Sequence, residues 1–265
     1  MTQLREIQRH LLSARLRLAI IFLGCIVLAL VTPQSSATTL PDFSILTIGD
    51  SITLGFKRHC RGEPNVCPRY DVLNPANEGN GVRIGGYQPE LEEIYNRYKS
   101  DTRAYNWGVG GDTSMGVLNR IDSVLNSRFA HYILIMVGTN EGGVSAETTA
   151  FNLGVMVDKA RAKGVTPVLA TLTYRNYNTG IVTGKNPHII ALANSKNVIL
   201  ADQYAATKPP NWVIADSGDG LHVGFEGDRI LAETWFTAIT GLPPGLPPEP
   251  PPLVIIPIIQ PLLLE

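Results

Sequence analysis

Short β-type segments alternate with helical segments through the middle of this chain, and that alternation limits the folds it can adopt. Five apolar runs with β-branched residues lie at 44–48, 103–107, 132–137, 166–171 and 197–201. The third and fourth runs are nearly continuous in apolar residues, as strands covered on both faces are. The pattern predicts an α/β fold, in which right-handed crossovers place helices on both faces of a parallel sheet.

Between these runs, apolar residues recur at spacings of three and four, which is the helical period. Four such stripes lie within 91–98, 117–125, 151–160 and 230–239. We interpret them as the core-facing sides of helices rather than as ligand sites. No internal repeat or linker interrupts the pattern, which predicts one domain over 38–242.

Composition excludes several classes of protein. Hydrophobic residues make up 44% of the 265 residues and charged residues 17%, which excludes a disordered or coiled-coil chain. The formal net charge of −1 offers no basic surface for nucleic acid, so we expect no nucleic-acid partner.

The first 37 residues have the features of an export signal. Arginines precede an apolar run at 18–31, which is shorter than the roughly 20 residues that span a bilayer. Small residues at 35–37 allow cleavage after Ala37. We therefore expect a signal peptide over 1–37 and a periplasmic or extracellular protein, with an uncleaved membrane anchor as the alternative. A lipoprotein signal at Cys25 is disfavoured, because apolar residues continue past it.

Two cysteines lie beyond that segment, Cys60 and Cys67, in a stretch that contains proline and glycine. In an oxidising compartment their spacing suits one local disulfide. A metal site that includes His59 is the alternative, but no fourth ligand is near and zinc sites usually show paired short spacings. We expect the disulfide, and neither a metal nor a cofactor.

The C-terminal end differs in composition from the rest of the chain. Residues 243–252 are rich in proline and resemble a polyproline-like spacer. The apolar run at 253–264 contains Pro257 and Pro261, which prevents a membrane-spanning helix. We treat 243–265 as a proline-rich linker and apolar tail. A partner-binding segment, a surface anchor and a poorly ordered end stay open as its role, and its partner is unknown.

Polar and small residues follow the predicted strands, at the edge of the sheet where ligands bind in such folds. Gly49-Asp50-Ser51 follows the first strand, Gly108 to Thr113 the second, and Gly138-Thr139-Asn140 the third. A serine at a strand–helix junction faces the positive end of a helix, glycine backbone N–H groups can approach a ligand closely, and an amide can donate to an oxyanion. Each segment taken alone is better explained as a turn or a helix cap, and only the set of segments points to a site.

A fourth segment, Asp219-Gly220-Leu221-His222, places a carboxylate three residues before an imidazole. In a tight turn that carboxylate can accept from the imidazole N–H and hold its tautomer. The remaining histidines, His10, His59, His131 and His188, are poorer candidates for a base because of their positions. A dinucleotide fingerprint is rejected, since threonine stands at 113 where glycine is required, and the chain has no Gly-x-Ser-x-Gly elbow.

These four blocks, in this order, resemble the SGNH hydrolases, also called GDSL esterases/lipases, over roughly 44–240. The resemblance implies a three-layer α/β/α sandwich of flavodoxin-like type with about five parallel strands. It implies Ser51 as nucleophile, His222 as base and Asp219 as the carboxylate that orients it. The oxyanion donors would be the N–H groups of Ser51 and Gly111 and the amide of Asn140. Two positions depart from the family pattern: Glu141 stands where aspartate is usual, and Ile52 where leucine is usual.

The expected function is an exported serine esterase that works through an acyl-serine intermediate. Polar and aromatic residues in or next to the predicted loops 57–86 and 173–186 favour short-chain or carbohydrate O-acetyl esters as substrates; they are Tyr70, Tyr87, Tyr174, Arg175, Tyr177 and Asn178. The partner would be a small-molecule or polysaccharide ester, with no membrane span in the mature chain. The alternatives are a lysophospholipase or thioesterase of the same family, and a non-catalytic binding module that keeps the fold.

Overall fold

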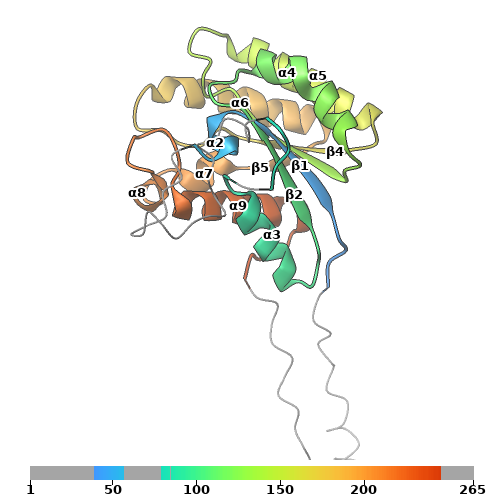
Figure 1. The fold of residues 1–265 in the computed structure, drawn as a ribbon. Helices are drawn as coiled ribbons and strands as arrows, with labels where there is room; N and C mark the ends of the chain where they lie inside the picture. Colours follow the sequence, from blue (N-terminus) through green and yellow to red (C-terminus); the bar gives the residue numbers. More distant parts are fainter. Residues whose placement is uncertain (1–38, 57–78, 84, 246–265) are drawn as a thin grey trace, which may run out of the picture. The chain divides into compact units, whose positions relative to one another are not determined.

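Parallel strands form the centre of the computed structural model, which describes residues 39–56, 79–83 and 85–245 (Figure 1). The described residues contain a five-stranded sheet in the order β2-β1-β3-β4-β5, with every neighbouring pair parallel. Its strands are β1 (Ser44–Gly49), β2 (Arg103–Gly108), β3 (Tyr132–Met136), β4 (Thr166–Ala170) and β5 (Ile199–Ala201). The α/β fold expected from the alternation is confirmed.

The register brings the ends of the three central strands level. Gly49 at the end of β1 pairs with Gly108 of β2 on one side and with Met136 of β3 on the other. The segments that follow these strands therefore start side by side at the carboxyl edge. This is where ligand sites form in open α/β sheets.

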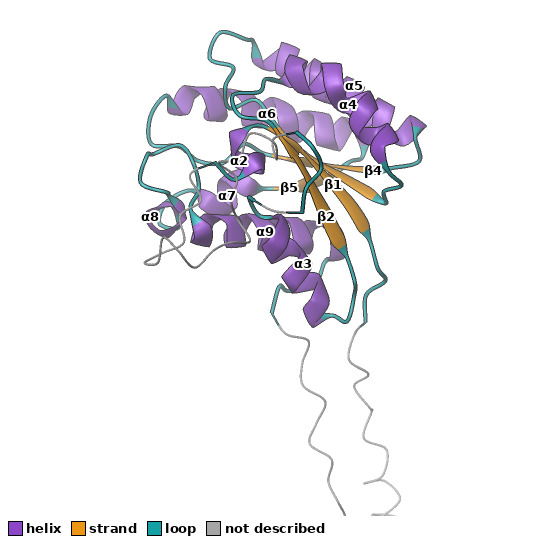
Figure 2. Cartoon of the chain, in the orientation of Figure 1, coloured by secondary structure: helices purple, strands orange, loops and turns teal. Residues whose placement is uncertain are grey.

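Helices cover both faces of the sheet (Figure 2). One face packs against α3 (Gln88–Arg97) and α9 (Phe225–Thr240), the other against α4 (Ser114–Ser127), α5 (Ala146–Ala162) and α6 (Thr179–Lys196). Alternate residues of β1 point to the two faces, because side chains of a strand alternate: Ile45 lies in the first core and Leu46 in the second. Three short helices complete the described part: α2 (Ser51–Leu54), α7 (Gln203–Thr207) and α8 (Trp212–Ala215).

Helix α6 is where the sequence prediction was wrong. Residues 173–186 were expected to form a loop, but α6 begins at Thr179 and includes Pro187. Its buried side includes polar side chains, which a search for an apolar stripe does not detect. Asn186, for example, accepts from the Leu172 N–H at 2.8 Å and donates to the Leu172 carbonyl at 3.1 Å. Of the expected loop 173–186, only the part before Thr179 is therefore a loop.

Several predictions concern residues at or beyond the limits of the described part. The expected signal peptide over 1–37, the Cys60–Cys67 disulfide, the His59 metal alternative and the tail after Gly245 lie outside the described residues. At the expected domain boundary, the chain remains in contact with the residue that follows α3, since Tyr98 Oη donates to the Pro243 carbonyl at 2.5 Å. Within the described residues, none of the helices has the length and apolar character that a bilayer crossing requires.

Candidate active site

Ser51, His222 and Asp219 form a continuous hydrogen-bonded chain although they come from opposite ends of the domain. His222 Nε2 lies 2.9 Å from Ser51 Oγ, and His222 Nδ1 lies 2.8 Å from Asp219 Oδ2. Ser51 and His222 are each 8% exposed, so both are shielded yet reachable. The structure therefore brings together the three side chains singled out in the sequence, in the order hydroxyl, imidazole, carboxylate.

The end of β1 determines where Ser51 lies. Asp50 caps the short helix α2 by accepting from the Ile52 N–H at 3.0 Å, which makes Ser51 its first residue. Gly55 ends the helix in the left-handed region at φ +86°, where its Cα is so close to Gly86 that a Cβ would lie 1.9 Å from the Gly86 nitrogen. A glycine is therefore needed at 55 for this tight turn after the serine.

A compact turn fixes Asp219 relative to His222. Asp219 Oδ1 accepts from the backbone N–H groups of Leu221 at 3.0 Å and His222 at 2.8 Å. Partial burial acts to raise the pKa of this carboxyl, but the hydrogen bonds from His222 and Leu221 outweigh it and lower the pKa to about 2. Asp219 is therefore a carboxylate at physiological pH, able to accept from the imidazole.

The two other predicted oxyanion donors lie on neighbouring turns. Gly111 has φ +73° in the turn after β2, and the space where its side chain would be is open. Asn140 follows β3, and its amide donates to the Asp112 carbonyl at 2.9 Å. This bond uses one of the two amide hydrogens of Asn140 and links the two turns.

Arg120 connects the strand ends beneath these turns, and sequence reasoning missed it. Its guanidinium donates to Asp112 Oδ2 at 2.8 Å, to the Trp107 carbonyl at 2.8 Å and to the Gly49 carbonyl at 3.0 Å. No motif marks this arginine, because two of its three partners are backbone carbonyls on different strands and the third is the Asp112 side chain.

Asp50 is a second aspartate beside Ser51 in a very different environment from Asp219. Burial raises its pKa to about 7, opposed by the hydrogen bond from the Ile52 N–H and reinforced by the negative charges of Asp112 and Glu141. Its Oδ2 atom is buried and has no hydrogen-bond partner among the described residues. Its capping role was detectable in the sequence as an aspartate before a helix, but its burial was not.

The residues expected to line a substrate pocket do not behave alike. Tyr87 is fully buried and packs near Trp235 with ring centroids 6.0 Å apart, so its assignment to the pocket was wrong. It was placed in a loop, but it directly precedes α3 and its ring belongs to the core. Tyr177 is 45% exposed and lies over the Arg175 guanidinium at 4.7 Å. Tyr174 is half-buried, Asn178 is exposed, and Tyr70 lies outside the described residues.

Phe56, which sequence reasoning did not single out, contacts the imidazole. Its ring meets that of His222 edge-on, with centroids 4.9 Å apart, and 37% of the residue is exposed. Two of the remaining histidines have structural environments. His131 Nδ1 accepts from the Ser44 N–H at 3.0 Å, and His188 lies 3.7 Å from Glu147 on the surface.

Comparison with known proteins identifies relatives of this chain. The profile of the GDSL-like lipase/acylhydrolase family matches residues 47–230. The esterase TesA of Pseudomonas aeruginosa is 28% identical over 153 residues, an alignment that spans 57% of this chain and 62% of that esterase.

Two solved structures show the same fold. The psychrotrophic esterase EstA of Pseudoalteromonas sp. superposes with a TM-score of 0.57 at 20% identity, covering 76% of this chain and 98% of that one. The acetylxylan esterase Axe2 of Geobacillus stearothermophilus gives a TM-score of 0.57 at 20% identity, covering 77% and 96%.

Proposed function

Because this chain belongs to the GDSL-like lipase/acylhydrolase family, we propose that it is a serine esterase with Ser51 as nucleophile. The resemblance that the sequence blocks indicated is confirmed at the level of the family. The observation that carries the catalytic proposal is the hydrogen-bonded chain from Ser51 Oγ through His222 to Asp219.

The proposed reaction has two halves. His222 Nε2 takes the Ser51 proton as Oγ attacks the ester carbonyl, and Asp219 stabilises the charged imidazole. The tetrahedral intermediate collapses, His222 returns the proton to the departing alcohol, and an acyl-serine remains. Water then attacks the acyl group with His222 again as base, which releases the acid and restores the Ser51 hydroxyl.

Charge on the carbonyl oxygen would be stabilised by donors that are in place before the reaction. The proposed donors are the N–H groups of Ser51 and Gly111 and the second amide hydrogen of Asn140. Two features support this assignment. Asn140 is held by its bond to the Asp112 carbonyl, and no atom lies within 4 Å of the position that a Gly111 side chain would take.

Among esters, we propose short-chain or carbohydrate O-acetyl esters as substrates. The exposed Tyr177 ring over Arg175 supports this choice, since polar aromatic surfaces suit sugars. The fold that this chain shares with an acetylxylan esterase is compatible with it. Lysophospholipid and thioester hydrolysis, and ligand binding without catalysis, are the competing outcomes.

Hydrolysis of p-nitrophenyl esters of increasing acyl length, beside acetylated xylan, tests this proposal. We expect highest kcat/KM for acetyl or butyryl esters, release of acetate from the polysaccharide, and loss of both activities in Ser51→Ala. A preference for long acyl chains would contradict the substrate assignment. Hydrolysis by Ser51→Ala at the wild-type rate would contradict the mechanism.

Export also belongs to the proposal. It is supported by the arginines and the apolar run within residues 1–37. N-terminal sequencing of protein recovered from outside the cytoplasm would give a chain beginning at Thr38 if the expected cleavage occurs, and a chain that keeps residues 1–37 would favour the membrane anchor.

A further inference from the structure

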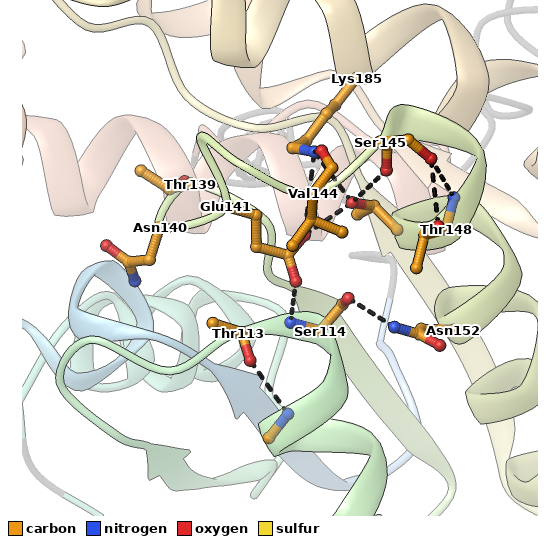
Figure 3. A network of polar contacts seen from close by, with 12 residues as sticks. Thr113, Ser114, Thr139, Asn140, Glu141, Val144, Ser145, Thr148, Asn152 and Lys185 are labelled. Atoms are coloured by element: carbon orange, nitrogen blue, oxygen red, sulfur yellow. Dashed lines mark hydrogen bonds and ion pairs between the residues drawn. The ribbon is translucent and has the colours of Figure 1, made fainter.

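Asn140, the proposed oxyanion donor, is followed directly by a buried glutamate, Glu141. Asn140 is exposed, and its amide is directed by the Asp112 carbonyl on the neighbouring turn. Glu141, in contrast, is 3% exposed, and Figure 3 shows the two consecutive side chains leaving the turn in different directions. The proposed oxyanion donor and a buried anchor are therefore adjacent in the chain.

The Glu141 carboxylate joins two helices to this turn. Its Oε1 atom accepts from the Ser114 N–H, at the start of α4, at 2.5 Å, and its Oε2 atom accepts from the Thr149 hydroxyl of α5 at 2.6 Å. A carboxylate at a helix N-terminus is favoured by the helix dipole. Because Ser114 lies three residues after Gly111, this contact also restrains the turn that carries Gly111.

Lys185 supplies the balancing charge from α6. Its side chain is 4% exposed, and its Nζ atom donates to the Val144 carbonyl at 2.7 Å and to the Thr149 hydroxyl at 3.0 Å. It lies 4.0 Å from Glu141 Oε2 and points toward it in Figure 3. Buried charges that lack a partner are strongly disfavoured, so the pair is held together.

Asn152 completes this arrangement by donating to the Ser114 hydroxyl at 2.8 Å. Contacts from α5 and α6 thus converge on the 138–141 turn and on the start of α4. These contacts thus link the turn that carries Asn140 to the helix that follows the Gly111 turn.

We propose that Glu141 and Lys185 are positioning residues, which hold Asn140 and Gly111 in the arrangement that binds the oxyanion. The proposal rests on the function proposed above and extends it to a buried pair that does not touch the substrate. The pair restrains Asn140 indirectly, through the backbone turn, so its loss weakens transition-state binding more than binding of the uncharged ester.

A double-mutant cycle between Glu141→Gln and Asn140→Ala tests this inference with a short-chain ester. We expect Glu141→Gln to lower kcat by about 10-fold or more with little change in KM, since a displacement of about 1 Å can cost about 100-fold. In the Asn140→Ala background the same change should cost at least about 3-fold less, because one of the two donors that it positions is already absent. An equal loss of kcat in both backgrounds would show a general structural role and overturn the proposal.

Lys185→Met and the milder Thr149→Val should likewise lower kcat more than they change KM. The matched control is Lys196→Met on the same helix, whose ammonium pairs with Asp158 on the surface at 2.7 Å and should leave kcat unchanged. Thr149→Val replaces a hydroxyl with a methyl group and leaves both charged side chains in place. It therefore still tests the proposal if the Glu141 and Lys185 variants do not fold. Wild-type kcat in folded Glu141→Gln or Thr149→Val would contradict the positioning role.

Failure of the proposed function gives a different result. A wild-type protein that neither hydrolyses esters nor reacts with a fluorophosphonate contradicts the esterase proposal, and the positioning role falls with it. Active wild-type protein whose Glu141 and Lys185 variants are equally active contradicts the positioning role alone.

Discussion

Two aspartates close to Ser51 differ in protonation because their surroundings differ. Asp219 accepts two backbone N–H groups and the imidazole, and its pKa is lowered to about 2. Asp50 is fully buried and accepts from the Ile52 N–H, and its pKa is raised to about 7. Near neutral pH, Asp219 is ionised, whereas Asp50 is close to half protonated. One residue type thus serves both as an ionised partner of His222 and as a helix cap that holds a proton in about half of the molecules near pH 7.

Stability should depend on pH through Asp50. Its pKa in the folded state lies above the 3.8 of an ordinary aspartate, so the folded protein holds this proton more tightly than the unfolded chain does. Protonated Asp50 therefore adds its full contribution to the free energy of unfolding below pH 4. This contribution falls as pH rises and is lost once pH passes 7. At 1.36 kcal/mol per pKa unit, the loss is about 4 kcal/mol.

Asp50→Asn should remove this dependence, because its amide oxygen still accepts from the Ile52 N–H but cannot ionise. Urea unfolding at pH 4 and pH 8 would measure it, with Asp158→Asn on the surface as control. If Asp50→Asn and wild type lost equal stability between these pH values, the result would contradict the raised pKa of Asp50.

Asn140→Ala should lower kcat by about 10²–10³-fold, or roughly 3–4 kcal/mol, with little change in KM, since one oxyanion donor is lost. Steady-state kinetics on p-nitrophenyl acetate would measure it. A change confined to KM would show that Asn140 binds the ester before reaction rather than its transition state.

At the level of elements, Arg120 on α4 links the ends of β1 and β2 through the Gly49 and Trp107 carbonyls and pairs with Asp112. The side chains of Arg120 and Asp112 are 22% and 11% exposed, so the pair is largely shielded from water. The strand ends that carry the Ser51 and Gly111 turns are therefore held together by one cation.

Arg120→Met should lower the free energy of unfolding by about 3 kcal/mol, because it leaves Asp112 as a shielded, unpaired carboxylate. Thermal unfolding should show a melting temperature lower by about 6–12 °C for a domain of this size. Lys159→Met, which removes a surface pair with Asp122, should cost less than about 1 kcal/mol. Equal effects of the two substitutions would mean that the Arg120 contacts add no more than a surface pair.

The strands and the four blocks were predictable because their signals are local. Apolar runs predicted all five strands to within two residues at either end; β5 starts at Ile199 because Asn197, with φ +49°, ends α6. The polar contacts of Arg120, Glu141 and Lys185 were not predictable, since each joins segments far apart in sequence. Helix α6 was incompletely predicted because glycines and Pro187 disrupt its pattern.

At the scale of the whole molecule, the strand order explains where the site forms. The sheet runs β2-β1-β3-β4-β5, so the chain moves to one side of β1 and then to the other. Such a reversal opens a crevice at the carboxyl ends of the strands, and Ser51 follows β1 at this point. Asp219 and His222 enter the same edge from the loop before α9.

Shortening the chain tests where the domain ends. A chain that ends at Gly245 should match the full chain in kcat and melting temperature, since it keeps the Pro243 and Pro244 carbonyls that accept from Tyr98 and Arg97. A chain that ends at Leu242 should lose about 1 kcal/mol, or about 2–4 °C in melting temperature. Equal melting temperatures for the two shortened chains would place the boundary at Leu242.

The central claim is that His222 and Asp219 activate the Ser51 hydroxyl, and covalent labelling tests it most directly. Intact mass spectrometry after treatment with a fluorophosphonate should show one adduct on wild-type protein. Peptide mapping should place it at Ser51, and the rate should fall steeply in His222→Ala. Folded wild-type protein that takes up no label, or labelling at Ser51 that is unchanged in His222→Ala, would contradict the account.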